Sequence, residues 1–353
     1  MVTRMRRFAV SFTAFTLMCS LSVSLWASGG QSDPASSAEK GSVEAANIAT
    51  MPEPSAELKR AQFTEIWAYL MAGEEAGLSR SMPITDVGYF GAGLNSFGKL
   101  SYVPKRSTLK GYHGRVHLVV AEVTNQALTH FCLDPDLPMR AGLVDSIAEA
   151  VKPFDGLQID FELVPASDRE NFIAFLSDLK ERIGKKPLSV ALPARTKTVD
   201  DAYDYAAISR IADRIIVMAY DEHWSGSAPG SIASIEWCKK VSAYALPQIG
   251  KDKLVMGIPF YGRAWGDATL SKAYRFSGLS RIIEERGVTE ISREDGIPSF
   301  EYVQPVKVRV FFEDSVSILA RAKMYQDSSV QNVSFWRLGQ EDPSVWEALA
   351  ILD

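Results

Sequence analysis

The sequence predicts an α/β fold, a closed (β/α)8 barrel with a small α+β insertion between its seventh and eighth strands. The first observation is that candidate strands and helical segments alternate along the chain, which is the order that produces a parallel sheet. The second is that the candidate strands number eight, as such a barrel requires. The third is that three of them end on functional-looking residues: Glu162, Tyr220 with Asp221, and Trp336. Active sites of these barrels lie at the C-terminal ends of the strands, so these residues should meet.

The first 61 residues are predicted to precede the barrel. Residues 1–29 combine an arginine-rich start, an apolar stretch from Phe8 to Trp26 and small residues after it, in the order of a secretory signal peptide. An uncleaved membrane anchor is the alternative, because this stretch approaches the roughly 20 residues that span a bilayer. Cys19 lies within it, but Met18 before Cys19 does not suit a lipidation site. Residues 30–61 are rich in Ser, Ala, Glu and Pro and are predicted to form a flexible linker.

Composition and charge are those of an ordinary globular protein, with 38 Lys and Arg, 43 Asp and Glu and a net charge of −5. This balance gives no reason to expect binding to nucleic acid or to an anionic membrane surface. With the N-terminal segment, it predicts an exported protein, periplasmic or extracellular, or held at the membrane by that segment. Cys132 and Cys238 are expected to be buried free thiols. The four histidines show no zinc-ligand spacing apart from a weak His113/His117 pair, so neither a metal nor a cofactor is expected.

The predicted strands are short apolar or alternating runs bounded by turn-forming residues. They are placed at residues 65–71, 84–92, 113–123, 156–162, 188–193, 214–221, 254–261 and 332–338. Three intervening segments carry apolar residues at i, i+3 and i+4, as crossover helices should: residues 137–152, 165–184 and 231–246.

The connection after Arg263 is too long for a single crossover helix. Residues 298–312 within it resemble a β-hairpin, which predicts a small α+β insertion at about residues 266–328 of a barrel domain spanning residues 62–353. Such an insertion would stand beside the mouth of the barrel, either as one wall of a substrate groove or as a structural flap.

The stretch from Phe154 to Glu162 organises the predicted site. With the period of a β-strand, Gln158, Asp160 and Glu162 point to one face and the apolar residues between them to the other. Asp160 and Glu162 then lie roughly 7 Å apart, and their repulsion raises the pKa of one of them unless hydrogen bonds intervene. Such a pair costs stability and suits general acid catalysis, although two acids could also form the solvated face of an edge strand.

The pattern Asp155, Gln158, Asp160, Glu162 resembles the DxxDxDxE signature of glycoside hydrolase family 18, the chitinase family, with Gln158 in place of the second Asp. The resemblance runs from about Thr64 to the C-terminus. Within the family, the sequence looks most like the bacterial branch that cuts spore-cortex peptidoglycan. Three further segments resemble later strands of the family: MAYDE at 218–222, GIPFYGRAW at 257–265 and VSFWRLGQED at 333–342.

The resemblance implies substrate-assisted catalysis, in which the 2-acetamido oxygen of the sugar attacks, because Asp160 shares a strand face with Glu162 and is badly placed as an in-line nucleophile. It implies that Glu162 is the general acid, that Asp160 orients the acetamido nitrogen and that Tyr220 donates a hydrogen bond to the acetamido oxygen. Trp336 would form the apolar floor beneath the ring. The other residues that it implies for substrate binding are Asp155, Gln158, Asp221, Tyr261 and Arg263.

The departure at Gln158 bears on the substrate. An amide can hydrogen-bond Asp160 but cannot take up charge, as the Asp found there in chitinases does. Amides at this position also occur in the cortex-lytic branch, so the change argues against a chitinase more than against activity.

Three functions remain open from the sequence. The first is an exported, monomeric N-acetylglucosaminidase that cleaves β-1,4 bonds of peptidoglycan or of a chitin-like polymer. The second is a non-catalytic, lectin-like carbohydrate-binding barrel, although such relatives commonly lose the acid that this chain keeps at Glu162. The third is a Mg²⁺-dependent enzyme with Asp155, Asp160 and Glu162 as metal ligands.

Overall fold

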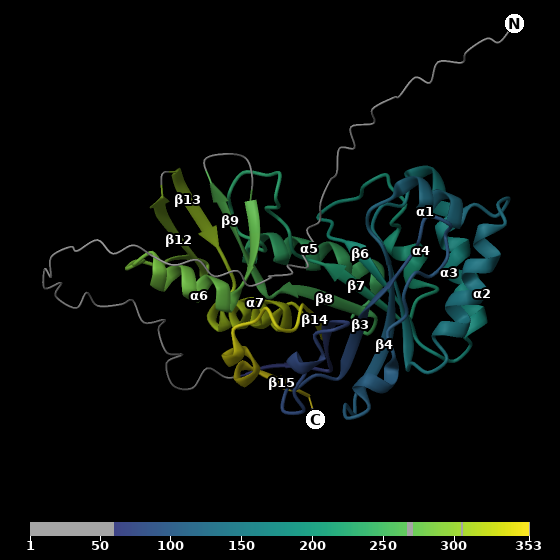
Figure 1. The fold of residues 1–353 in the computed structure, drawn as a ribbon, viewed down its shortest axis with the longest axis horizontal. Coiled ribbons are helices and arrows are strands. Elements are labelled where there is room, and N and C mark those ends of the chain that lie inside the picture. The colour runs from purple at the N-terminus through teal and green to yellow at the C-terminus, as the bar shows by residue number, and fades with distance from the viewer. Residues whose placement is uncertain (1–59, 267–270, 305, 353) are drawn as a thin grey trace, which may run out of the picture. The chain divides into compact units, whose positions relative to one another are not determined.

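The computed structural model describes residues 60–266, 271–304 and 306–352, which lie in one compact unit of the chain. Within these ranges, eight parallel strands close into a barrel in the order β14, β2, β3, β4, β5, β6, β7, β8. The predicted (β/α)8, or TIM, barrel is therefore confirmed (Figure 1). The barrel strands are β2 Glu65–Met71, β3 Asp86–Gly93, β4 Arg115–Glu122, β5 Gly156–Phe161, β6 Leu188–Pro193, β7 Arg214–Met218, β8 Leu254–Pro259 and β14 Asn332–Trp336.

The observed strands agree with the predicted positions to within a few residues, and the main differences arise where the chain leaves the barrel. β7 ends at Met218 rather than Asp221, because Asp221 has a φ of 56°, a left-handed conformation that cannot continue a strand. β8 ends at Pro259 because Tyr261 already belongs to a strand of another sheet.

Helices cover the outside of the barrel, as Figure 1 shows for α1 to α5. Their apolar side chains face the strands, and this is clearest for α3, whose buried residues Phe172, Phe175, Leu176 and Leu179 recur at helical spacing. The helices are α1 Gln126–Leu133, α2 Met139–Ala150, α3 Arg169–Ile183, α4 Tyr205–Ser209, α5 Ile235–Ile249 and α7 Ser315–Asp327, with 3-10 turns η1 Glu75–Gly77, η2 Arg106–Leu109, η3 Ala166–Asp168 and η4 Pro343–Ala348.

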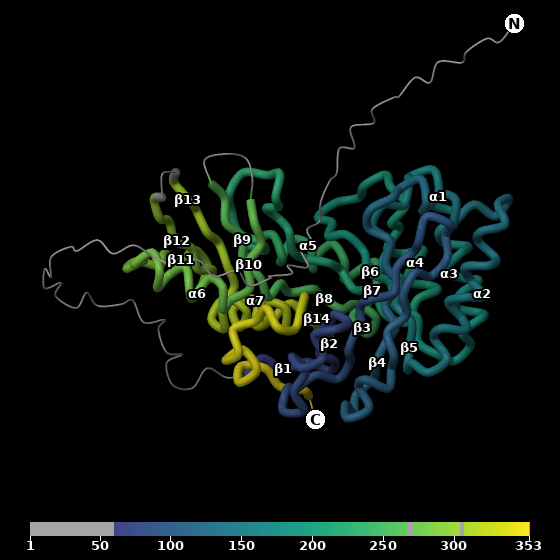
Figure 2. The backbone as a smooth tube through the Cα atoms, in the orientation of Figure 1, coloured from purple at the N-terminus to yellow at the C-terminus, as the bar shows by residue number. Residues whose placement is uncertain are grey.

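A second, antiparallel sheet is inserted between β8 and β14, with the strand order β10, β9, β13, β12, β11. The predicted hairpin is confirmed as β12 and β13, which pair from Ser299 with Phe311 to Gln304 with Val306. Figures 1 and 2 show this sheet with α6 on one side of the barrel and α1 to α3 on the other. Its elements are β9 Tyr261–Gly266, β10 Ser271–Arg275, α6 Phe276–Glu285, β11 Ser292–Glu294, β12 Ile297–Gln304 and β13 Val306–Phe311.

The described chain begins and ends in one small parallel sheet, β1 Ala61–Phe63 with β15 Leu349–Ile351. Ala61, predicted as the last linker residue, is already buried in this sheet. The predicted signal segment and nearly all of the predicted linker lie outside the described residues. In the described ranges, no helix has the length and apolar character needed to cross a membrane. Cys132 and Cys238 are buried free thiols, as predicted.

An ionic cluster lies at the N-terminal ends of the strands, at the end of the barrel opposite the mouth. Glu65 accepts hydrogen bonds from Arg115 (2.6 Å) and Arg214 (2.7 Å), and Asp86 accepts from Arg115 (2.8 Å). His117 also contacts Asp86, at 2.8 Å from Nε2. The cluster joins β2, β3, β4 and β7, so it fixes their register below the site.

Candidate active site

β5 carries the two central carboxylates to the mouth of the barrel. Phe161 points outward and stacks on Phe175 of α3, with ring centroids 5.7 Å apart. Because side chains alternate along a strand, Asp160 and Glu162 point inward, as predicted. The backbone N–H of Glu162 donates to the carbonyl oxygen of Glu122 on β4 (3.0 Å), so the strand pairing holds Glu162 at the rim.

Asp160 is a buried acid, and one of its carboxyl oxygens has no partner among the described residues. Its side chain lies within the barrel with 4% of its surface exposed, and its Oδ1 makes no hydrogen bond within the described part of the chain. Burial and the negative charge of Glu162 hold the pKa of Asp160 well above its usual range. A buried, unsatisfied acceptor costs free energy, and a substrate N–H placed against it would recover that cost.

Glu162 stands further out, and its side chain is exposed at the rim. Enough protein still surrounds the carboxyl group to disfavour its charged form. Burial and the charge of Asp221 raise the pKa of Glu162. A raised pKa keeps a carboxyl group protonated at higher pH, which is the property a general acid needs.

Gln158 lies one step deeper on the same face of β5 and is fully buried. Its Nε2 donates to the hydroxyl oxygen of Tyr69 on β2, and its Oε1 has no partner among the described residues. The amide therefore anchors Tyr69, and no hydrogen bond joins it to Asp160. The hydrogen bond to Asp160 that an amide could make is therefore not formed among the described residues.

The segment after β7 and the start of β9 supply a second group of polar side chains. The carboxylate of Asp221 accepts a hydrogen bond from the Tyr261 hydroxyl (2.6 Å) and one from Arg263 (3.0 Å). The ring of Tyr220 packs edge-on against Tyr261, with centroids 6.5 Å apart. Burial raises the pKa of Tyr220 and of Tyr261 well above the usual range, so both hydroxyls stay protonated. The Tyr261 hydroxyl donates to Asp221, which leaves the Tyr220 hydroxyl as the donor for a substrate.

Trp336 ends β14 and is half-buried. Its ring lies 5.2 Å from that of Tyr69 and 5.3 Å from that of Phe90, the latter in an edge-on arrangement. These neighbours support the indole as an apolar surface at the mouth of the barrel. Sequence analysis missed both Tyr69 and Phe90, although each lies near the C-terminal end of a predicted strand and could have been found there.

The loops around the mouth are tied together by Glu74, which the sequence analysis also missed. Glu74 pairs with Arg275 at the start of α6 (2.5 Å) and with Arg337 directly after Trp336. These contacts link the loop after β2 to the inserted sheet and to the end of β14. No local sequence signal identifies such a bridge, because its partners are about 200 residues or more away.

Asp155 does not join this group, which corrects its predicted role in substrate binding. It precedes β5, so it lies at the opposite end of the strand from Glu162. Its carboxylate accepts from the backbone N–H of Val116 (2.8 Å) and pairs with Arg106 (3.2 Å), contacts that stabilise the base of the barrel. A shared Mg²⁺ site with Asp160 and Glu162 is therefore ruled out by position. In the described ranges, no three His, Cys, Asp or Glu side chains form a group that could hold a metal.

Comparison with known proteins points to one family. The family model for glycosyl hydrolases family 18 matches residues 131–341. The uncharacterised glycosylase YvbX of Bacillus subtilis is 30% identical over 206 residues, which cover 55% of this chain and 60% of that protein. The cortical fragment-lytic enzyme of B. subtilis is 25% identical over 300 residues, 78% of this chain and 70% of that one.

The fold is shared with solved structures as well. The crystal structure of the Bacillus cereus spore cortex-lytic enzyme SleL matches with a TM-score of 0.73 at 24% identity, covering 83% of this chain and 76% of that one. This likeness concerns the fold alone.

Proposed function

The chain belongs to glycosyl hydrolase family 18, and we propose that it is an exported N-acetylglucosaminidase that cleaves β-1,4 bonds of a GlcNAc-containing glycan by substrate-assisted, retaining catalysis. Peptidoglycan is the proposed substrate, with a chitin-like polymer as the nearest alternative. We also propose that it acts as a monomer, and that residues 1–29 direct its export.

The observation that carries this proposal is the buried carboxylate of Asp160, whose Oδ1 lacks a partner, two residues before a rim carboxyl with a raised pKa. An acetamido N–H is a donor of the right kind for this oxygen. Asp160 would hold the nitrogen so that the acetamido oxygen faces the anomeric carbon, and the positive charge that develops would stabilise its ionised form.

Glu162 would donate its proton to the leaving glycosidic oxygen and later take a proton from the incoming water. The raised pKa supports the first role, because the acid must be protonated in the resting enzyme. Once the leaving sugar has departed, the same carboxylate is a base close to the cyclic intermediate.

Tyr220 and Trp336 complete the proposed sugar site. The protonated hydroxyl of Tyr220 would donate to the acetamido oxygen and hold it for attack. The half-buried face of Trp336 suits the C–H face of a pyranose. Asp221, braced by Tyr261 and Arg263, would accept a hydrogen bond from a sugar hydroxyl.

Peptidoglycan is favoured by the named activity of one relative, the cortical fragment-lytic enzyme, and by the amide at position 158. The test is digestion of purified peptidoglycan and of chitin oligomers, followed by mass analysis of the new reducing ends. The proposal expects peptidoglycan fragments that end in GlcNAc. Binding of both glycans without any new reducing end would instead identify a lectin-like barrel.

A further inference from the structure

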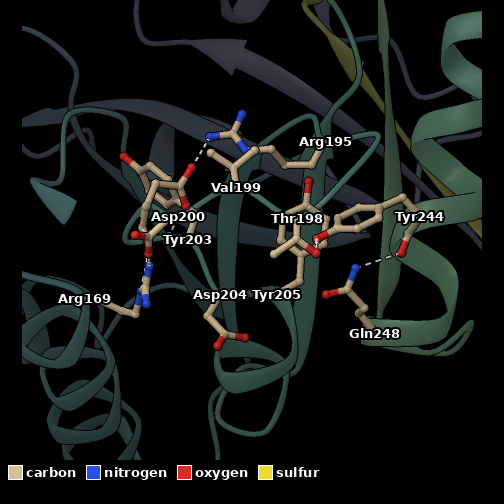
Figure 3. Close-up of a pocket in the computed structure, with 11 residues that line it drawn as sticks. Arg169, Arg195, Thr198, Val199, Asp200, Tyr203, Asp204, Tyr205, Tyr244 and Gln248 are labelled. Atoms are coloured by element: carbon tan, nitrogen blue, oxygen red, sulfur yellow. Dashed lines mark hydrogen bonds and ion pairs between the residues drawn. The ribbon is translucent and has the colours of Figure 1, made fainter.

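A separate pocket of about 220 Å³ is lined in part by the loop that follows β6 (Figure 3). Arg195 and Val199 come from this loop, Arg169 begins α3, and Tyr244 comes from α5. The volume is below the roughly 300–1,000 Å³ of pockets that hold a whole small ligand. It suits a short substituent of a larger substrate better than a row of sugar rings.

The pocket shares a wall with the catalytic segment. Tyr203 lines the pocket, and its hydroxyl donates to the carbonyl oxygen of Phe161 (2.9 Å) and accepts from the backbone N–H of Val164 (3.1 Å). These two residues flank Glu162 closely in the chain. Tyr203 therefore connects the pocket to the segment of chain that carries Glu162.

The order of the strands indicates which part of the substrate would reach the pocket. In the closed barrel, the insertion between β8 and β14 stands across the mouth from β4 and β5. Trp336 and Asp221 lie towards the insertion, at the ends of β14 and β7, and Glu162 lies on the far side. A sugar held by the first two residues would expel its leaving group towards Glu162, and so towards the pocket.

The pocket contains charged hydrogen-bond donors that a ligand could use. Arg195 pairs with Asp201, but its Nε is buried without a partner within the described residues. Arg169 pairs with Asp200 (2.5 Å), whose side chain is 96% exposed, so solvent screening makes this pair easy to exchange. A carboxylate entering the pocket would supply the acceptor that Arg195 lacks, and an amine could take up Asp200.

We propose that this pocket binds a short, carboxylate-bearing peptide attached to the leaving sugar, and that it selects peptide-substituted glycan over bare glycan. The proposal rests on the proposed glycosidase function and adds the substituent that the substrate carries. Peptidoglycan has such peptides on alternate sugars, whereas chitin has none.

The test compares two substrates, peptidoglycan strands with their peptides and the same strands after an amidase has removed them. The wild-type chain is expected to show at least about tenfold higher kcat/KM on the peptide-bearing strands, as one hydrogen bond between charged groups would give. Arg195→Gln removes the unpaired donor, and Val199→Trp fills the pocket. Both should reduce the preference to less than about threefold while activity on bare strands stays within about twofold of wild type.

A matched control is Arg281→Gln, which removes an exposed arginine of α6 whose ion pair in the described part of the chain is with Glu285 on its own helix. It should leave the preference unchanged. Equal rates of wild type on both substrates, or a preference that survives in both pocket variants, would overturn the proposal.

Titration of the full chain with the amidase-released peptide separates this proposal from the glycosidase function. Saturable binding of the peptide that Val199→Trp abolishes would support the pocket. If the chain then cleaves neither glycan, only the glycosidase function fails. Absence of binding, or binding that both pocket variants keep, rejects the pocket.

Discussion

At the scale of single residues, Glu162 carries the proton that the proposed reaction transfers. Glu162→Gln keeps the size and most contacts of the side chain but removes that proton. Turnover is expected to fall by about 10²–10⁴-fold, while the affinity for a GlcNAc oligomer stays within a few-fold of wild type. Steady-state kinetics and ligand titration on the same preparation measure both. Retention of more than about a tenth of wild-type turnover would place the acid elsewhere.

Asp221 sets part of the pH dependence through its charge on Glu162. Burial is the larger cause of the raised pKa of Glu162, and the negative charge of Asp221 adds to it. Asp221→Asn should therefore lower the pKa of Glu162. Because the acid must be protonated, the alkaline limb of the kcat/KM profile should move to lower pH.

The position of that limb is independent of how much activity the variant keeps, so loss of a sugar contact does not obscure the result. A limb that stays in place or moves to higher pH would contradict the assignment of Glu162 as the titrating acid.

Some features of the site follow from the sequence and others do not. The alternation in strand β5 was sufficient to place Asp160 and Glu162 on one face, because the period of a strand leaves no other arrangement. Asp155 was assigned to the site by the motif, although it precedes β5 and therefore lies at the base of the barrel. The contact of Gln158 with Tyr69 could not be predicted, because the two residues are 89 positions apart and meet only when the barrel closes.

At the scale of elements, the connection from the insertion back to the barrel depends on a buried ion pair. Glu313 lies two residues after the end of β13. It pairs with Arg321 of α7 (2.9 Å), and both side chains are fully buried. Arg321 also donates to the carbonyl oxygen of Ala233 before α5 (3.1 Å). This pair joins three segments that the sequence pattern treats as separate.

Arg321→Leu is expected to lower the free energy of unfolding by about 3–5 kcal/mol, because it leaves the buried Glu313 without its cation and with only the Ser317 hydroxyl as a side-chain donor. The double variant Arg321→Leu/Glu313→Leu should recover part of that loss, since no unpaired charge remains. Chemical denaturation of the three proteins tests this. A double variant less stable than Arg321→Leu would show that the charges themselves, rather than their pairing, are needed.

At the scale of the whole molecule, closure of the barrel couples stability to pH through Glu65. Burial alone would raise the pKa of Glu65, but hydrogen bonds from Arg214, Trp67 and Arg115 lower it from 4.5 to about 2. A lowered folded-state pKa contributes stability that is fully present above about pH 4.5 and is lost as the pH falls towards 2. The free energy of unfolding should therefore fall over this range.

Glu65→Gln should reduce stability at neutral pH and flatten the dependence between pH 4.5 and 2. Denaturation curves at several pH values measure both effects. An equally steep pH dependence in Glu65→Gln would assign the acid sensitivity to other carboxylates.

The overall architecture was accessible from the sequence because eight alternating strand and helix patterns admit few closed arrangements. The insertion between β8 and β14 was predicted only as a small α+β element that contains one hairpin. Its five-stranded order depends on β9, which follows the last residues of β8 almost directly and gives no separate signal in the sequence.

The central claim is that the acetamido group of the substrate is the nucleophile, with Asp160 and Tyr220 holding it. The most direct measurement compares hydrolysis of an N-acetylated glycan with that of the same glycan after deacetylation, in the presence and absence of a GlcNAc-thiazoline that mimics the cyclic intermediate. The thiazoline should inhibit and the deacetylated glycan should be inert, because that glycan offers neither the attacking carbonyl nor the donor for Asp160. Efficient cleavage of the deacetylated glycan, or a covalent sugar ester trapped on Asp160, would contradict it.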